Sequence, residues 1–201
     1  MKRNEKCLED PETDLFNPNV LKQLSLPQTD GLSIRPLKSE DYDRGFLQLL
    51  AQLTEVGNVS REQFLSRFHM MKNAGNYYVI IIEDVNDEKL VATATLIVEQ
   101  KFIHNCAVYI VEPLSIRAKT LLQRGRLEDV VVNSEYRGKH LGKLAVKIIL
   151  ELSRYLGCYK LTLDCKDRLI PFYESLGFKR EPNNANYLNM RFPAIAEQSH
   201  L

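Results

Sequence analysis

A run of glycines and basic residues between Arg137 and Lys143 has the composition of a phosphate-binding turn. Gly138 and Gly142 stand four residues apart, and a glycine lets the backbone approach a ligand without a Cβ in the way. The run leads into a helical pattern, and the N–H groups of a helix N-terminus favour anions. It has neither the G-K-[ST] ending of a P-loop nor a G-x-G-x-x-G fingerprint. A short pyrophosphate-binding turn fits these residues, and packing glycines beside a solvated basic face would fit them too.

Three carboxylates are candidates for binding a polar substrate or accepting a proton: Glu128, Asp129 and Asp164. Glu128 and Asp129 are adjacent, and side chains of adjacent residues in a regular strand point to opposite faces. One of them would then face a ligand while the other packs or caps. A solvated charge at a strand end would explain each acid equally well, and the pattern does not single out one acid as the base.

The elements around the turn predict how these residues are positioned. An apolar strand pattern covers residues 127–132, and a helix is expected from about 139 to 155 because apolar residues recur at spacings of three and four. A further strand pattern covers residues 160–163. The stretch therefore predicts a strand–turn–helix–strand unit with the basic turn at the start of the helix.

Other patterns complete a mixed α/β order. Strands are predicted at 32–35, 77–83, 90–102 and 187–192, and helices at 40–53 and from Ser60 to Lys72, with a last helix around 171–176. Ser39 is the expected cap of the first helix, and Ser60 with Gln63 has the spacing of a capping box. The polar run 84–89 predicts the turn of a hairpin.

The run R-G-K-H-L-G at 137–142 resembles the acetyl-CoA motif of the GNAT acetyltransferase superfamily. Further motifs resemble its glucosamine-6-phosphate N-acetyltransferase branch, in the same order along residues 31–192. They are L-T-E-V-G at 53–57, V-A-T-A-T-L at 91–96, K-F-I-H at 101–104, R-G-R-L-E-D-V-V-V at 124–132, T-L-D-C at 162–165 and F-Y-E-S-L-G-F at 172–178.

This resemblance implies a GNAT fold, with a central, mostly antiparallel twisted sheet flanked by helices and a β-α-β unit for acetyl-CoA. The implied activity is the acetyl-CoA-dependent N-acetylation of D-glucosamine 6-phosphate, by direct transfer in a ternary complex. The products are N-acetyl-D-glucosamine 6-phosphate and CoA, on the route to UDP-N-acetylglucosamine. The resemblance also implies a homodimer with active sites at the subunit interface, and it implies no metal.

Individual roles carry over by position in the motifs. The catalytic residues implied are Tyr173, as the acid that protonates the departing thiolate, and the carboxylates Glu128, Asp129 and Asp164. The implied cofactor contacts are Val130, Val131, Val132, Arg137, Gly138, Lys139, His140, Leu141, Gly142, Lys143 and Tyr173. The implied substrate contacts are Thr54, Lys101, Phe102, Ile103, His104, Glu128, Asp129, Asp164 and Arg191.

Two stretches depart from the family pattern. Residues 108–122 form an insertion after the K-F-I-H motif, and its apolar content argues that it packs on something. Leu169-Ile170-Pro171 stands where relatives often carry an asparagine contact to the cofactor. These departures motivate one alternative function, a catalytically impaired CoA-binding variant. A second alternative is a GNAT enzyme for another amine, either a polyamine or a protein lysine.

The composition sets outer bounds. The 201 residues are enough for one domain, expected at 31–192, with an N-terminal arm at 1–30, either flexible or docking, and a tail at 193–201. The 27 Lys and Arg residues nearly balance the 26 Asp and Glu residues, so no global field favours nucleic acid. The four cysteines show no metal-ligand spacing. A cytoplasmic protein with at most peripheral contact to endomembranes is expected, because no apolar run reaches about 18 residues.

Overall fold

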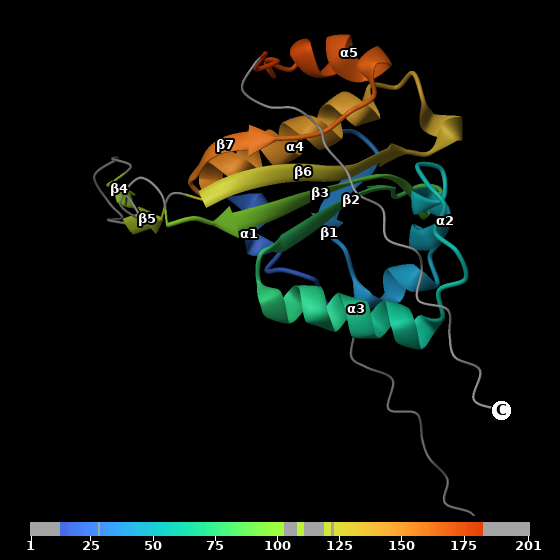
Figure 1. Cartoon of the computed structure of the whole chain (residues 1–201). Helices are drawn as coiled ribbons and strands as arrows, with labels where there is room; N and C mark the ends of the chain where they lie inside the picture. Colours follow the sequence, from blue (N-terminus) through green and yellow to red (C-terminus); the bar gives the residue numbers. More distant parts are fainter. Residues whose placement is uncertain (1–12, 28, 103–107, 111–118, 122, 183–201) are drawn as a thin grey trace, which may run out of the picture. The chain divides into compact units, whose positions relative to one another are not determined.

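The computed structural model describes residues 13–27, 29–102, 108–110, 119–121 and 123–182 (Figure 1). The chain divides into two compact units, residues 1–163 and residues 164–201. The predicted single domain at 31–192 and the tail at 193–201 stay predictions. The strand predicted at 187–192 lies outside the described residues.

The first unit is built on a five-stranded sheet in the order β1-β2-β3-β6-β7. Its strands are β1 (Leu32–Pro36), β2 (Tyr77–Asp84), β3 (Lys89–Gln100), β6 (Gln123–Val132) and β7 (Cys158–Thr162). All neighbours are antiparallel except β6 and β7, which are parallel. The predicted mixed α/β class with a mostly antiparallel sheet is therefore confirmed.

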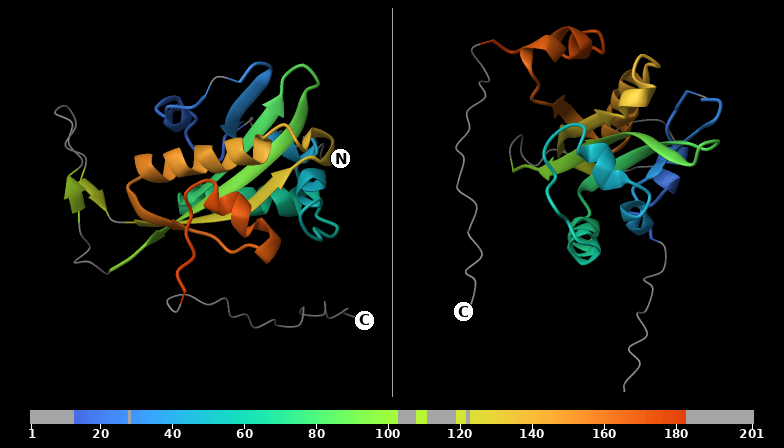
Figure 2. Two further views of the ribbon diagram at one scale, coloured as in Figure 1. Left: turned by 90° about the horizontal axis from the view of Figure 1, so that it is seen from above. Right: turned by 90° about the vertical axis from the view of Figure 1, so that its right-hand side faces the viewer.

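Helix α4 (Leu141–Tyr155) joins the two parallel strands and packs on β3, β6 and β7. Apolar residues at spacings of three and four bury one side of α4, and Ile148, Ile149 and Leu152 are fully buried there. Figures 1 and 2 show α4 along one face of the sheet and α3 (Arg61–Ala74) on the other. The β6–α4–β7 unit is the predicted strand–turn–helix–strand arrangement.

The opposite face of the sheet carries a second apolar core. Short helix α2 (Phe46–Leu50) and α3 pack here against β2 and β6. Paired residues share a face, so Val79, Ile81 and Val131 point into this core together. The buried members of the cluster are Leu15, Leu37, Phe46, Leu49, Phe64, Phe68, Val79, Ile81, Leu90 and Val131.

Helix α3 begins where the capping box predicts. The Ser60 hydroxyl accepts a hydrogen bond from the Gln63 backbone N–H at 3.1 Å, and the Gln63 side chain accepts one from the Ser60 N–H at 2.8 Å. The helix ends at Gly75, whose φ of +68° is the left-handed conformation that glycine adopts at low cost.

The single helix predicted over 40–53 is wrong. The structure has a short 3-10 helix, η1 (Ser39–Tyr42), followed by α2. Gly45 separates them with a φ of +90°, which interrupts the helical path. Asp41 also turns inward, where its carboxylate accepts hydrogen bonds from the Arg35 guanidinium and from the Lys38 backbone N–H at 2.8 Å. These tertiary contacts outweigh the local helical pattern.

Part of the segment predicted as an N-terminal arm contributes to the core. Leu15 is 2% exposed, and its N–H donates to the Leu37 carbonyl at 2.8 Å. The Phe16 ring lies 5.1 Å from the Tyr78 ring. Helix α1 (Asn19–Lys22) follows, so residues 15–22 pack as an ordered part of the first unit.

The insertion forms a pairing of its own. Strand β4 (Val108–Ile110) pairs antiparallel with β5 (Lys119–Leu121), and this two-stranded sheet is separate from the five-stranded sheet. The insertion lies in the connection between β3 and β6. These two strands stay paired up to Gln100 and Gln123, the residues at either end of that connection. The main sheet therefore keeps its register on both sides of the insertion.

The second unit contains η4 (Asp167–Leu169) and α5 (Ile170–Glu174). Pro171 lies in the first turn of α5, where its missing N–H costs nothing.

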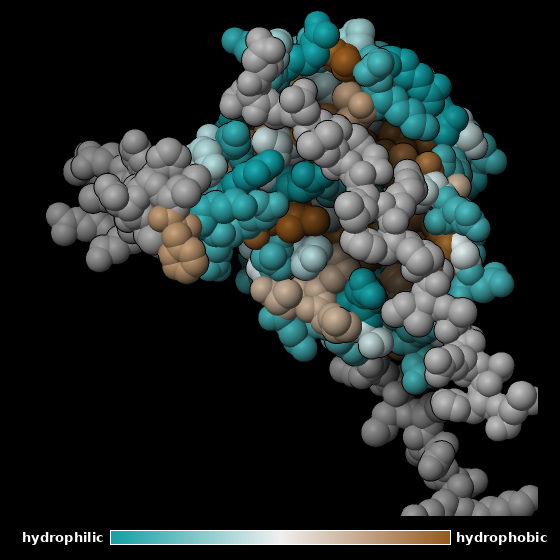
Figure 3. Space-filling view, viewed as in Figure 1, coloured by the Kyte–Doolittle hydropathy of each residue, from teal (hydrophilic) through white to brown (hydrophobic). Residues whose placement is uncertain are grey.

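On the face shown in Figure 3, hydrophilic residues cover most of the described surface. None of the helices in the described residues is long and apolar enough to cross a membrane.

Candidate active site

Strand β6 carries an irregularity at Asp129. Thr93 and Thr95, two apart on β3, pair with Val131 and Glu128, three apart on β6, so β6 holds one extra residue. Asp129 has a φ of +52°, which is rare for a residue other than glycine and is tolerated best by Asp and Asn. This is a β-bulge, and bulges re-aim side chains next to functional sites.

The bulge interrupts the regular strand alternation that was expected for the two acids. Regular alternation across Glu128 and Asp129 does not apply, because the extra residue resets the faces: Glu128 and Val131 now share one face. Glu128 is half-buried and ion-paired with Arg126. Asp129 is exposed as a residue, but protein atoms crowd its carboxyl and Glu128 lies beside it, so its pKa is raised. A raised pKa makes the Asp129 carboxylate a better proton acceptor than an ordinary aspartate.

One edge of β6 beyond Arg126 is not paired with β7. The parallel register runs from Gln123 opposite Cys158 to Arg126 opposite Thr162 and stops there, while β6 continues to Val132. No other pairing of the described residues uses this edge. Backbone N–H and C=O groups of Val130 to Val132 are therefore available to an extended ligand, as β-strand addition requires.

The basic turn follows this edge directly. Asn133 N–H donates to the Val91 carbonyl at 2.9 Å, and η3 (Ser134–Tyr136) leads into the exposed residues 137–140. Gly138 and His140 have φ values of +83° and +61°. The His140 side chain does not cap α4, so it leaves the N–H groups of the first turn of α4 available to an anion.

The predicted cofactor residues other than Tyr173 thus lie on one continuous strand–turn–helix path. Leu141 is buried and fixes the start of α4, Gly142 is half-buried, and Lys143 is exposed beside the first turn. The Arg137 and Lys139 side chains are exposed on the same turn. The path offers main-chain groups first and an anion site after them.

The structure describes only some of the residues predicted to bind the substrate, and their roles stay predictions. Thr54 follows the end of α2 and its N–H donates to the Leu50 carbonyl at 3.3 Å. Lys101 pairs with Glu99 at 2.6 Å, and this hydrogen bond is the main reason that the pKa of Glu99 is lowered. The Phe102 residue is 96% exposed. Ile103, His104 and Arg191 lie outside the described residues.

Two predicted catalytic residues belong to the second unit. Asp164 is exposed at its start. The Tyr173 ring is buried between Phe172 and Phe178, with ring centroids 4.9 Å and 5.8 Å away. Burial, with a contribution from Cys165, raises the pKa of Tyr173, so the phenol keeps its proton at neutral pH. A protonated phenol is the form that a general acid needs.

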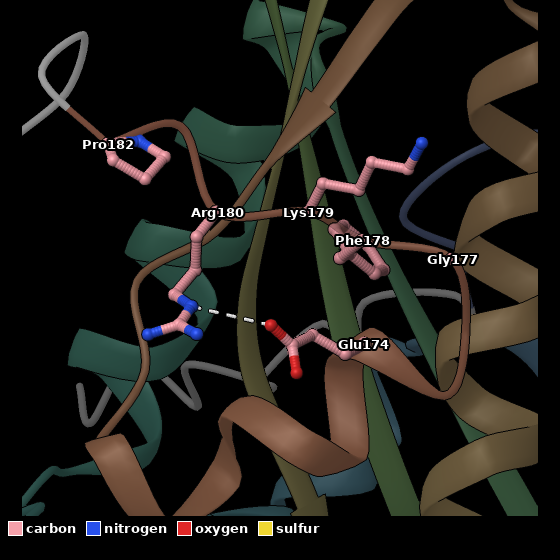
Figure 4. Close-up of a pocket in the computed structure, with 6 residues that line it drawn as sticks. All are labelled: Glu174, Gly177, Phe178, Lys179, Arg180 and Pro182. Carbon is pink, nitrogen blue, oxygen red and sulfur yellow. Dashed lines mark ion pairs between the residues drawn. The ribbon is translucent and has the colours of Figure 1, made fainter.

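A pocket of the second unit adjoins Tyr173 in sequence. Figure 4 shows its lining, with the Arg180 guanidinium pointing toward the Glu174 carboxylate at 3.3 Å. The side chains of Phe178 and Lys179 come from the segment after α5. The lining residues are Glu174, Gly177, Phe178, Lys179, Arg180 and Pro182.

Two contacts at the site are not evident in the sequence. The Gln52 side chain accepts a hydrogen bond from the Ser134 backbone N–H at 2.7 Å, which links the end of α2 to the start of the basic turn. The second contact is that of Tyr136, which is buried at the end of η3 and donates from its hydroxyl to Asp87 at 2.8 Å. The only signal for it in the sequence was a tyrosine immediately before R-G-K. No group of His, Cys, Asp and Glu side chains within the described ranges is arranged to hold a metal ion.

The bulged strand, its unpaired edge and the turn into an uncapped helix are features suited to binding an extended ligand with an anionic part. Residues 44–178 match the family model described as Acetyltransferase (GNAT) family, and the chain belongs to this family of acetyltransferases. The prediction of the GNAT family is confirmed.

Several proteins within this family are similar to the chain over most of their length. A protein of Drosophila melanogaster, named probable glucosamine 6-phosphate N-acetyltransferase, is 49% identical over 196 residues, which cover 90% of this chain and 83% of the relative. Glucosamine 6-phosphate N-acetyltransferase 1 of Dictyostelium discoideum is 38% identical over 76% of this chain and 87% of its own. The crystal structure of glucosamine-6-phosphate N-acetyltransferase from Arabidopsis thaliana superposes with a TM-score of 0.69 at 32% identity, covering 83% of this chain and all of that one.

Proposed function

We propose that this protein transfers the acetyl group of acetyl-CoA to the amine of D-glucosamine 6-phosphate. The observation that carries the proposal is the open, bulged edge of β6 leading straight into the basic turn, in a chain 49% identical to a relative named for this reaction. The products are N-acetyl-D-glucosamine 6-phosphate and CoA. The expected place of the reaction is the synthesis of UDP-N-acetylglucosamine.

Acetyl-CoA binds along β6 and the turn. Main-chain groups of Val130 to Val132 pair with the amides of the pantetheine arm, because this edge is not used by β7. The N–H groups between Gly138 and Gly142, with the charge of Lys139, hold the pyrophosphate at the start of α4. The uncapped helix N-terminus supports this fit, since its donors would otherwise face only water.

The acceptor binds beside the two acids of β6. The phosphate of the sugar calls for cations and small donors, and Lys101, Arg191 and Thr54 have those chemistries. Glu128, Asp129 and Asp164 match the hydroxyl and amine groups of the sugar. Phe102, Ile103 and His104 complete the set proposed on the acceptor side.

The reaction needs one proton acceptor and one proton donor. The substrate ammonium gives a proton to a carboxylate, for which the raised pKa of Asp129 is suitable. The neutral amine then attacks the thioester carbonyl, whose oxygen is stabilised by β6 backbone N–H groups, and a new C–N bond forms. The C–S bond breaks, and the Tyr173 phenol protonates the leaving thiolate. The second proton of the attacking nitrogen leaves as the amide forms, and it restores the proton of the Tyr173 phenol.

Transfer proceeds directly between the two substrates in a ternary complex. The thiolate is the nucleophilic form of cysteine. Burial raises the pKa of Cys158 to about 11, and it raises the pKa of Cys165, where Asp167 and Asp164 also contribute. Both described cysteines are therefore protonated at neutral pH, and neither is suited to carry the acetyl group.

The test is a thiol-release assay with acetyl-CoA and three parallel acceptors: glucosamine 6-phosphate, glucosamine and spermidine. We expect turnover with the 6-phosphate, and a loss of at least about 100-fold in kcat/KM without the phosphate, because charge-assisted contacts are lost. Equal activity on glucosamine or preference for spermidine would instead indicate a GNAT enzyme for another amine. CoA binding without turnover on any acceptor would indicate the impaired variant.

A further inference from the structure

Tyr136 ties the basic turn to a distant part of the chain. Its hydroxyl lies 2.8 Å from Oδ2 of Asp87, in the turn between β2 and β3, and 3.1 Å from Oδ2 of Asp84, the last residue of β2. Tyr136 itself is 7% exposed. These contacts span 49 and 52 residues of sequence, so the phenol links the end of η3 to the β2–β3 turn.

The Tyr136 ring also contacts the ammonium group of Lys139, which belongs to the proposed pyrophosphate site. Lys139 Nζ lies 4.4 Å from the ring centroid, within the range of a cation–π contact. Lys89 Nζ lies 5.9 Å from this ring and pairs with Glu135. The Tyr136 clamp, defined as Tyr136, Asp84, Asp87 and Lys139, thus joins two carboxylates to one basic side chain of the turn.

The basic turn is exposed around Gly138, so a contact that restrains it would help it to bind a ligand. Gly138 has open space where a Cβ would lie, and residues 137–140 are exposed. Upstream, the turn is held through Asn133 and Ser134, whose N–H groups donate to the Val91 carbonyl and the Gln52 side chain. Tyr136 is two residues closer to Gly138 than Ser134 is. An exposed turn that must be ordered on binding weakens affinity, and restraining it beforehand reduces that cost.

We propose that Tyr136 is a positioning residue for acetyl-CoA: through Asp84 and Asp87 it holds the turn in the conformation that receives the pyrophosphate, and its ring holds the Lys139 ammonium beside that site. This inference rests on the proposed function for the identity of the ligand. It concerns the cofactor alone, so removing the hydroxyl affects acetyl-CoA binding and leaves sugar phosphate binding unchanged.

The electrostatics support a donor at this position. The two carboxylates that surround the phenol raise its pKa above the usual value, with the Asp87 hydrogen bond as the main cause. The hydroxyl therefore keeps its proton across the neutral and mildly alkaline range. One phenol proton serves two acceptors, and the nearby Lys89 and Lys139 offset the negative charge that they bring together.

The experiment compares Tyr136→Phe with the unchanged chain. Phenylalanine keeps the ring and its contact with Lys139 and removes only the hydroxyl. We expect the KM for acetyl-CoA to rise about tenfold, as for loss of a hydrogen bond to a charged acceptor, with the KM for glucosamine 6-phosphate unchanged. The Kd of CoA, measured by calorimetry without acceptor, should rise by the same factor.

Two further variants make the result specific. Tyr155→Phe removes a hydroxyl from a half-exposed tyrosine at the end of α4 and should change neither constant. Asp87→Ala, at an exposed position, removes the partner instead of the phenol. If the hydroxyl acts through Asp87, the Tyr136→Phe/Asp87→Ala double variant should be less impaired than the product of the two single effects.

The outcomes separate the clamp from a merely structural contact. Equal weakening of both KM values, or a lowered melting temperature with CoA affinity unchanged, would overturn the proposal. If the unchanged chain binds CoA but does not turn over the sugar phosphate, the proposed acceptor fails, and the calorimetric comparison still decides the clamp. If CoA binds equally well to the unchanged chain, Tyr136→Phe and Asp87→Ala, the clamp fails alone.

Discussion

At Asp129 a single residue has both a backbone role and a chemical role. Its φ of +52° forms the bulge, and its carboxyl lies beside Glu128. Asparagine tolerates the left-handed conformation about as well as aspartate does. The two roles are therefore separable by one substitution that keeps the bulge and removes the charge.

We expect Asp129→Asn to fold normally and to lower kcat/KM for glucosamine 6-phosphate by about 100-fold, the low end of the effect of a general base. Steady-state kinetics and circular dichroism provide the two measurements. A variant as active as the parent would show that this position contributes through the bulge alone.

The pH dependence follows from the same carboxyl. Crowding and Glu128 raise the pKa of Asp129, so its carboxylate forms at a higher pH than that of an ordinary aspartate, near 3.9. Activity that needs the carboxylate should rise with pH through the raised pKa. The acid limb of kcat/KM should therefore lie above about pH 4 in the parent chain and be missing in the residual activity of Asp129→Asn.

Tyr173 invites a comparable test in the second unit. Tyr173→Phe keeps the ring contacts with Phe172 and Phe178 and removes only the acidic proton. We expect kcat to fall about 100-fold with both KM values nearly unchanged, because a general acid acts in the transition state. An unchanged kcat would mean that water or another group protonates the thiolate.

At the scale of elements, ion pairs connect β1, η1 and β2. Arg35 bonds both oxygens of Asp41 at 2.8 Å and Glu83 Oε2 at 2.8 Å, and Arg44 also pairs with Glu83. The Asp41 side chain is fully buried. Hydrogen bonds to these acids raise the pKa of Arg35 despite its burial. These ion pairs hold η1 and β2 against β1, the edge strand of the sheet.

Removal of Arg35 should be costly for this reason. We expect Arg35→Ala to lower the free energy of unfolding by about 3–5 kcal/mol, because it removes the nearest charged partner of the buried Asp41 carboxylate. Arg61→Ala is the matched control, since Arg61 and Asp43 form an exposed pair, and it should cost less than about 1 kcal/mol. Urea denaturation measures both, and equal losses would contradict the assignment.

The insertion at residues 108–122 can be tested by deleting it. Among the described residues, strands β4 and β5 pair with one another and with no other strand, and β3 and β6 pair up to Gln100 and Gln123. Removing residues 108–122 leaves residues 101–107 to connect these strands, more than the about 2–5 residues that a hairpin loop needs.

We therefore expect the chain without residues 108–122 to keep its melting temperature within about 4 °C, since no pairing of the main sheet is lost. Its activity on glucosamine 6-phosphate should be retained. Activity that appears only after the deletion would instead identify the full chain as an impaired form. Collapse of the sheet would contradict the separate pairing of β4 and β5.

At the scale of the whole molecule, the expected assembly is a homodimer. Its basis is the family resemblance, in which both subunits contribute to each acceptor site. Sedimentation equilibrium should give a mass of two chains of 23.2 kDa each. A monomer that is fully active on glucosamine 6-phosphate would exclude shared active sites.

Local patterns determined much of this protein in advance. The capping box at Ser60 predicted the start of α3, and the apolar spacing after His140 predicted α4, because both signals depend on neighbours within about one helical turn. The strand–turn–helix–strand unit and the basic turn followed from the same kind of signal. The motifs around Arg137 and Glu128 predicted the acetyltransferase family, and the comparisons confirm it.

Only the tertiary structure decided the features that depend on distant partners. The bulge at Asp129 arises from the register of β6 on β3, and the break at Gly45 accompanies the burial of Asp41 against Arg35. The contact of Tyr136 with Asp87 joins residues 49 apart. A single sequence carries no local signal for such pairings, because their free energy comes from groups that meet only when the sheet is assembled.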